Sequence, residues 1–155
     1  MKEKYIIIVC TCNKDIKDYI TEKIIQDITP NETEKYENDY FGIRDKNGNL
    51  SWDFLVVKKG NIKIIITKSS ETIRQINMAI LKGSLIKAGK KIPSGCENIP
   101  AINKDEIKVI YINRNGEVKG IEVEESGFDI DEMDEMIEEI NKKTEDMYYE
   151  LKYGD

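Results

Sequence analysis

The chain has 155 residues, of which 39% are hydrophobic and 35% charged, with a formal net charge of -6 and no histidine. This balance excludes a wholly disordered protein, and the length predicts one domain spanning residues 1–155. No run approaches the ~18 apolar residues that would cross a membrane. The first four residues lead into a β-like run instead of a signal peptide. We therefore expect a cytoplasmic protein.

Charge and histidine content narrow the range of functions. The acidic balance disfavours nucleic acid and anionic membranes as partners. The lack of histidine excludes Ser-His, Cys-His and histidine–metal sites. Cys10, Cys12 and Cys96 are an odd number without paired spacing, which favours reduced thiols over a disulfide framework or structural zinc. The sequence thus predicts no metal and no cofactor. An enzyme using Cys12 or carboxylates is the least favoured class, because no base accompanies the thiol.

The predicted fold class is α+β, with a mixed α/β sheet. The continuous apolar run at residues 5–10 predicts a central strand covered on both faces. Isoleucines at every fourth position predict a helix over 15–28. The polar segment 31–39 predicts a loop, and the β-branched and aromatic runs between 40 and 67, separated by turn residues, predict a three-stranded meander.

The second half of the chain carries clearer signals. A serine at 69 or 70 can cap a helix predicted over 70–87. Asn115-Gly116 between two β-branched runs predicts a hairpin over 107–123. An apolar stripe opposite many carboxylates predicts an acidic C-terminal helix over 130–150.

Two strand-to-helix junctions, after residues 10 and 66, are small, polar and cationic. If their strands are parallel neighbours, both junctions lie at the carboxyl edge of the sheet, where helix N-termini offer N–H groups to anions. The sequence predicts a site there for a nucleotide or another phosphate-bearing ligand, formed by Thr11, Asn13, Lys14, Lys68, Ser69, Ser70 and Arg74. Ordinary helix capping accounts for the same residues. The chain has no Gly-x-x-x-x-Gly-Lys-Ser/Thr loop, which disfavours a P-loop hydrolase.

The acidic terminal helix is the second candidate surface. Between residues 58 and 91 the chain carries nine basic residues and one acid, whereas the part after Gly120 is dominated by carboxylates. Solvated helix surfaces account for this pattern, and so does a binding surface for a protein partner or a second copy. The residues predicted to make that contact are Asp131, Glu135, Glu138 and Glu139.

The order of elements over residues 61–139 resembles the C-terminal part of OLD-type ABC-class ATPases of prokaryotic defence systems and mobile elements. The resemblance is carried by the run Asn61–Glu71 and by the run Glu106–Gly116. In that family the first run leads to a switch histidine and the second opens a terminal hairpin. Here Lys68 or Ser69 stands at the switch position, and the nucleotide-binding Walker motifs are absent. The resemblance implies a helix end at 51–58, where Trp52, Phe54, Val56 and Val57 indicate a strand.

Together these patterns predict a non-catalytic binding or regulatory protein that captures a phosphate-bearing ligand. The alternative is an acidic inhibitor or antitoxin-like module that acts on a basic partner surface in a phage or bacterial defence context. The Ile-, Lys- and Asn-rich composition fits an AT-rich bacterial or phage genome.

Overall fold

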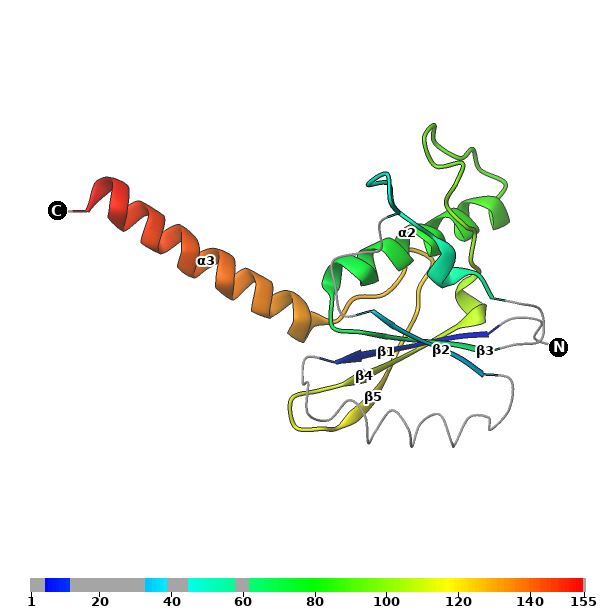
Figure 1. The fold of residues 1–155 in the computed structure, drawn as a ribbon, viewed down its shortest axis with the longest axis horizontal. Helices are drawn as coiled ribbons and strands as arrows, with labels where there is room; N and C mark the ends of the chain where they lie inside the picture. Colours follow the sequence, from blue (N-terminus) through cyan, green and yellow to red (C-terminus); the bar gives the residue numbers. More distant parts are fainter. Residues whose placement is uncertain (1–4, 12–32, 39–44, 58–61, 155) are drawn as a thin grey trace.

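In the described part of the chain, five strands form one mixed sheet, one long helix lies across a face of this sheet, and another projects from its carboxyl edge (Figure 1). The computed structural model describes residues 5–11, 33–38, 45–57 and 62–154. Along the chain the elements are β1 (Tyr5–Thr11), β2 (Thr33–Asn38), the 3₁₀ turn η1 (Asp53–Leu55), β3 (Ile62–Thr67), α2 (Ser70–Lys87), the 3₁₀ turn η2 (Lys104–Glu106), β4 (Ile107–Ile112), β5 (Val118–Ile121) and α3 (Asp131–Tyr153).

The sheet has the strand order β2-β3-β1-β4-β5, with β1 at its centre. Strands β1 to β4 are parallel, and β5 runs antiparallel to β4. In the register, Ile8 pairs with Ile65 on one side and with Val109 on the other. The isoleucine-rich runs suit this position because central parallel strands are buried on both faces. The predicted α+β class and the central strand are confirmed.

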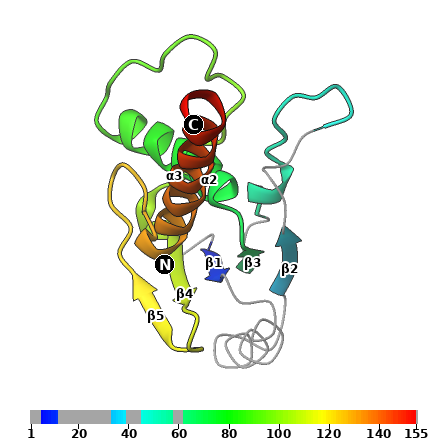
Figure 2. The ribbon, with the colours of Figure 1, turned by 90° about the vertical axis from the view of Figure 1, so that its left-hand side faces the viewer.

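Both faces of the sheet are packed. On one face Ile8, Ile65 and Val109 pack in a cluster with Ile76 and Ile80 of α2. This is the face that α2 crosses in Figure 2. The other face carries a second buried cluster, formed by Ile7, Val9, Ile64, Ile66, Ile110 and Ile112. The alternation of side chains along each strand therefore divides one apolar run between two cores.

Helix α2 covers residues 70–87, as its sequence predicts. Ser69 is its N-cap, and Lys87 lies in its last turn. Polar side chains of α2 also hold the irregular segments around it. Asn77 Nδ2 donates to the Phe128 carbonyl at 2.9 Å, and its Oδ1 accepts the Phe128 amide at 3.0 Å. Ser84 Oγ donates to the Glu125 carbonyl at 2.6 Å. Helix α2 thus fixes the segment between β5 and α3, which forms no helix or strand of its own.

The strand predicted between Trp52 and Val57 is wrong. Asp53–Leu55 form a 3₁₀ turn instead, in which Phe54 and Leu55 are buried in the core on the α2 side. Lys63 of β3 donates from Nζ to the Val56 carbonyl at 2.9 Å and to the Asp53 carbonyl at 3.4 Å. A buried lysine thus satisfies backbone carbonyls that a strand would have paired in a ladder. Over the described residues 51–57, the helix end that the family resemblance implies at 51–58 is not found either.

The meander predicted over 40–67 is therefore wrong in its second strand. Its first strand, at 40–44, lies outside the described residues, and its last strand is found. That strand, β3, lies between two parallel neighbours, whereas a meander would require antiparallel ones. The loop predicted over 31–39 is wrong as well, because Thr33–Asn38 form the edge strand β2. An edge strand is held by backbone hydrogen bonds to a single neighbour and needs no continuous apolar run. The helix predicted over 15–28 lies outside the described residues.

The C-terminal part follows its predictions closely. Strands β4 and β5 form the predicted hairpin, whose turn has Gly116 at a φ of 81°. Asn113 Oδ1 accepts the amides of Asn115 and Glu117, both at 2.9 Å. Helix α3 then runs from Asp131 to Tyr153 and extends away from the sheet and α2 (Figure 1).

Candidate functional site

The two predicted junctions end neighbouring strands. Strands β1 and β3 are parallel, and Cys10 pairs with Thr67 in their register. Thr11 and Lys68, the residues that follow this pair, therefore lie at the same carboxyl edge of the sheet. Asn13 and Lys14, the other predicted residues of the first junction, lie outside the described part of the chain.

The start of α2 is a hydrogen-bonded cap. Thr67 Oγ1 accepts the Ser69 amide at 3.0 Å, and Ser69 Oγ accepts the Thr72 amide at 3.4 Å. Thr11 and Thr67 are completely buried, whereas Lys68, Ser69 and Ser70 are half-buried. Arg74, one turn further along the helix, is exposed. Capping therefore accounts for part of the predicted ligand set, and the accessible groups belong to Lys68, Ser70 and Arg74.

The start of α3 brings carboxylates to this edge. Burial raises the pKa of Asp134 above its ordinary value, and the neighbouring charge of Asp129 raises it further. The positive charge of Arg74 opposes this rise. The predicted basic site on α2 and the acidic surface on α3 are thus neighbours, so that an anion at this edge would meet charges of both signs.

The first turn of α3 is anchored to the body of the protein. Ile130 and Met133 are buried in the core on the α2 side. Glu132 forms an ion pair of 3.1 Å with Arg114 in the hairpin turn. The Ile130 carbonyl accepts the amides of Met133 and Asp134. These contacts fix the direction in which the helix leaves the sheet.

Beyond this turn, the apolar stripe of α3 lies in solvent. Ile140 is 62% exposed, Met147 67% and Leu151 87%. The four predicted partner-binding residues, Asp131, Glu135, Glu138 and Glu139, are exposed too. Lys143 Nζ lies 2.9 Å from Glu139 Oε1, and this hydrogen bond lowers the pKa of Glu139. The helix therefore presents both an acidic and an apolar surface.

Three tyrosines near the end of α3 form a cluster that sequence reasoning missed. The rings of Tyr148 and Tyr149 meet edge to face at 5.8 Å, and those of Tyr149 and Tyr153 stack at 5.9 Å. Lys152 Nζ lies 5.7 Å from the centre of the Tyr148 ring and 5.5 Å from that of Tyr153. Tyrosines at i and i+4 on an exposed helix were the available signal. Tyrosine is enriched where proteins contact each other.

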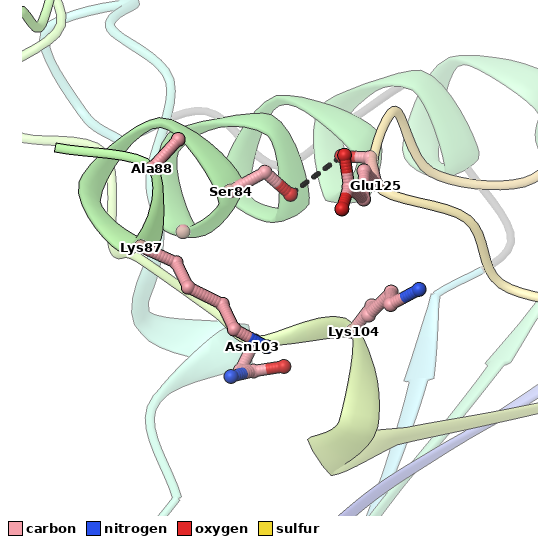
Figure 3. Close-up of a pocket in the computed structure, with 7 residues that line it drawn as sticks. Ser84, Lys87, Ala88, Asn103, Lys104 and Glu125 are labelled. Atoms are coloured by element: carbon pink, nitrogen blue, oxygen red, sulfur yellow. Dashed lines mark hydrogen bonds between the residues drawn. The ribbon is translucent and has the colours of Figure 1, made fainter. Parts of the chain in front are cut away.

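A cavity of about 240 Å³ with a mixed polar and apolar lining lies between the C-terminal half of α2 and the loop that leads into β4 (Figure 3). Its polar lining comes from Ser84, Lys87, Asn103, Lys104 and Glu125. The two lysines offset the negative end of the α2 dipole. This cavity lies at the edge of the sheet opposite to the predicted site, and no motif in the sequence marks it.

A second hollow, of about 250 Å³, is apolar and lies on the outer side of α2. Met78, Leu81, Leu85, Ile92, Pro93 and Cys96 are among the residues that line it. Lys82 closes one side by donating to the carbonyls of Cys96, Glu97 and Ile99 at 2.9, 3.0 and 2.6 Å. The hollow is therefore part of the packing between α2 and the loop after it.

Neither a cluster of metal-ligating side chains nor a membrane-spanning helix occurs among the described residues. Among these residues there is no group of three or more histidine, cysteine or carboxylate side chains placed to bind a metal ion. Cys10 is buried in β1, and Cys96 is half-buried in the loop after α2. None of the helices described is long and apolar enough to cross a membrane.

No family model, no curated protein and no solved structure matches this chain. The case for function therefore rests on the geometry of α2 and α3.

Proposed function

We propose that this protein is a non-catalytic binding protein that engages another protein through α3. The observation that supports this is the apolar stripe of a helix that is anchored at one end only. Exposed apolar side chains concentrated on one element are typical of surfaces that contact another protein. Ile140, Met147 and Leu151 supply the apolar area, and the tyrosine cluster adds rigid aromatic side chains.

The carboxylates of α3 indicate the charge that the partner surface should carry. Glu135, Glu138 and Glu139 are exposed, so a surface that accepts the apolar stripe gains affinity when basic residues rim it. This is the contact expected of the acidic inhibitor or antitoxin-like alternative. The apolar stripe carries most of the affinity in this proposal, because exposed ion pairs contribute only about 0–1 kcal/mol each.

Site-specific photo-crosslinking in living cells tests this function. A photoreactive amino acid at position 147 of the full chain is expected to capture a protein, whereas the same residue at position 86 is not. Ile86 on α2 is the matched control, because it is 54% exposed and lies on the other helix. Absence of any product at position 147, or equal products at both positions, contradicts the proposal.

A second candidate function is the capture of a phosphate-bearing ligand or nucleotide at the carboxyl edge. The parallel pairing of β1 with β3 supports it, because Thr11, Lys68, Ser69 and Ser70 then lie at one edge, with Arg74 one helical turn further along. The resemblance to OLD-type ATPases points to the same edge, since Lys68 or Ser69 stands where that family has its switch histidine. The carboxylates of Asp129 and Asp134 oppose it.

Native mass spectrometry of the purified protein and thermal shifts with nucleotides test this second function. A ligand present at 100 times its Kd stabilises the folded state by about 2.7 kcal/mol. We expect a Lys68→Ala/Arg74→Ala variant to lose that stabilisation. A Lys87→Ala/Lys104→Ala variant, which removes two lysines at the opposite edge, should keep it. Equal losses in both variants, or no shift in the wild type, reject the site.

A further inference from the structure

The apolar residues of α3 follow a heptad pattern. Met133, Ile137, Ile140, Thr144, Met147 and Leu151 are spaced alternately four and three residues apart. This spacing places them in one line along a helix and is the a/d pattern of two-stranded coiled coils. We call the last five of these residues the seam.

The seam is free along most of its length, whereas Met133 is buried in the body of the protein. Ile137 is 36% exposed, and exposure rises toward Leu151 at the other end. Thr144, the one polar member, donates its hydroxyl to the Ile140 carbonyl at 2.8 Å, so its hydrogen-bonding capacity is met within the helix. A partner helix can therefore cover the seam without leaving this hydroxyl unsatisfied.

Charge decides between the two directions in which a second α3 can run. Four acids, Asp131, Glu132, Asp134 and Glu135, are crowded at the base of the helix. The stretch from 138 to 153 is more balanced, with five acids and three lysines. A parallel pair would place the acidic N-terminal ends of the two helices side by side. An antiparallel pair holds these ends at opposite ends of the coiled coil.

Lys143 and Glu150 supply complementary charges beside the seam. They are seven residues apart and both occupy the g position of the heptad. When Thr144 of one helix faces Met147 of an antiparallel copy, Lys143 of each helix lies opposite Glu150 of the other. The arrangement is two-fold symmetric and therefore self-complementary. It also pairs Ile140 with Leu151 of the second copy.

We propose that α3 binds a second copy of this chain, forming a short antiparallel two-helix coiled coil centred between Thr144 and Met147. This inference rests on the proposed function and names its partner. Two-fold pairing buries the seam residues from Ile140 to Leu151, together with the flanking Tyr148, in both copies. Their exposed parts amount to on the order of 1,000 Å² in total, which is the lower limit for a specific interface. The dimer is accordingly weak and concentration-dependent, with a micromolar Kd.

Sedimentation velocity of the full-length protein over a range of concentrations tests the association. We expect a monomer–dimer equilibrium that Leu151→Lys weakens by about tenfold or more, because it places a charge in the seam. Ile86→Glu on α2, an equally drastic change at an exposed isoleucine, is the matched control and should leave the Kd unchanged. Circular dichroism checks that each variant keeps its helix content. A wild-type protein that stays monomeric at high micromolar concentration overturns the proposal, as does an equal effect of the control.

Charge reversal tests the antiparallel direction. Lys143→Glu and Glu150→Lys should each weaken the dimer by about three- to tenfold, and the double variant should regain the wild-type Kd. Lys143 also pairs with Glu139 of its own helix. Both Lys143→Glu and the double variant lose that local bond, so any rescue must arise between the two copies. A double variant as weak as Lys143→Glu rejects the antiparallel register.

The crosslink at position 147 separates this inference from the function on which it rests. A product with twice the mass of the chain supports both. A product with a different protein, together with a monomeric purified chain, overturns the second copy as partner and leaves the proposed function standing. Absence of any product at position 147 contradicts both the proposed function and the second copy as partner.

Discussion

Helices α2 and α3 are both long and amphipathic, yet they stand in opposite relations to the rest of the molecule. On α2, Ile76 and Ile80 are completely buried against the sheet. On α3, the residues from Ile140 to Leu151 carry an equally regular apolar stripe that remains in solvent. The helix itself extends away from the sheet (Figure 1). A stripe of apolar residues therefore predicts that a helix has a partner. It does not tell whether that partner belongs to the same chain.

The polar side chains of the two helices differ in the same way. Those of α2 bond to the backbone of distant segments, as Asn77 does with Phe128 and Lys82 with the loop at 96–99. Those of α3 beyond its first turn bond within the helix, as Lys143 does with Glu139. Helix α2 thus organises the fold, whereas α3 is an attached element that contributes little to it.

The largest expected contrast is in stability. Ile80→Ala on α2 should lower the free energy of unfolding by about 2–5 kcal/mol, because it opens a cavity in the core. Ile140→Ala on α3 should change it by less than about 0.5 kcal/mol in the dilute monomer. Urea unfolding followed by circular dichroism measures both. Similar losses in the two variants would show that the apolar stripe of α3 is covered within its own chain.

Gly83 tests how closely α2 packs against the segment before η2. A Cβ at this position would overlap the backbone carbonyl of Ile102, whose amide bonds to Ala79 of α2 at 3.1 Å. Gly83→Ala should therefore cost about 1–3 kcal/mol of unfolding free energy, despite the better helix propensity of alanine. Gly120→Ala on β5 is the control, since nothing lies within 4 Å of its Cβ. A neutral Gly83→Ala would mean that the two segments are less tightly packed.

Lys82 tests whether α2 holds the loop after it. Lys82→Met keeps the length of the side chain but removes three hydrogen bonds to loop carbonyls. We expect a loss of about 1–2 kcal/mol and faster hydrogen exchange confined to residues 90–102. Lys87→Met, at an exposed lysine on the same helix, should change neither. Exchange that is unchanged in the Lys82 variant argues against this role.

The smallest expected effect concerns the charges where the two helices meet. Burial raises the pKa of Asp134 in the folded protein, so the native state binds more protons than the unfolded state just above the ordinary Asp pKa. Stability contributed by this group is present below the unfolded pKa and is lost as pH rises through the folded pKa. Relative to the wild type, Asp134→Asn should therefore become more stable as pH rises through the weakly acidic range.

The expected size of this effect is small because neighbouring charges offset one another. Asp129, Asp131 and Glu138 raise the pKa of Asp134, whereas Arg74 lowers it. Asp131→Asn is the control variant. Asp131 is exposed, and its negative charge acts only by raising the pKa of Asp134. Thermal unfolding at several pH values measures both variants. A stability of Asp134→Asn that falls relative to the wild type as pH rises would indicate that the charge of Arg74 outweighs burial.

Elements with a strong local pattern were predicted nearly to the residue. Helix α2 matches its predicted bounds, and the hairpin turn at Asn115-Gly116 needs only a glycine at positive φ. Errors fall where tertiary contacts override local preference. Trp52–Val57 has the composition of a strand, but the burial of Phe54 and Leu55 and the bonds from Lys63 make it a turn. β2 escaped prediction because its pairing with β3 does not show in its own residues.

The candidate sites were likewise predicted where they depend on local sequence and missed where they depend on tertiary contacts. Residues at the start of α2 were predicted to share an edge with Thr11, and the parallel register brings the two junctions together. The proximity of Asp134 to Arg74 was not predicted, because it depends on where the chain re-enters the body after β5. The cavity lined by Lys87 and Lys104 was missed for a similar reason, since its residues come from three separate segments.

By itself, the sequence determined the class of the fold, the central strand, the hairpin and the two amphipathic helices, because each depends on side chains close together in the chain. The tertiary structure alone decided that the apolar stripe of α2 is buried and that of α3 is exposed. The reason is physical: the hydrophobic effect rewards the removal of apolar area from water but has no preferred direction. The apolar stripe of a helix therefore indicates how much apolar area must be buried. Only the tertiary structure shows whether the surface that buries it belongs to the same chain.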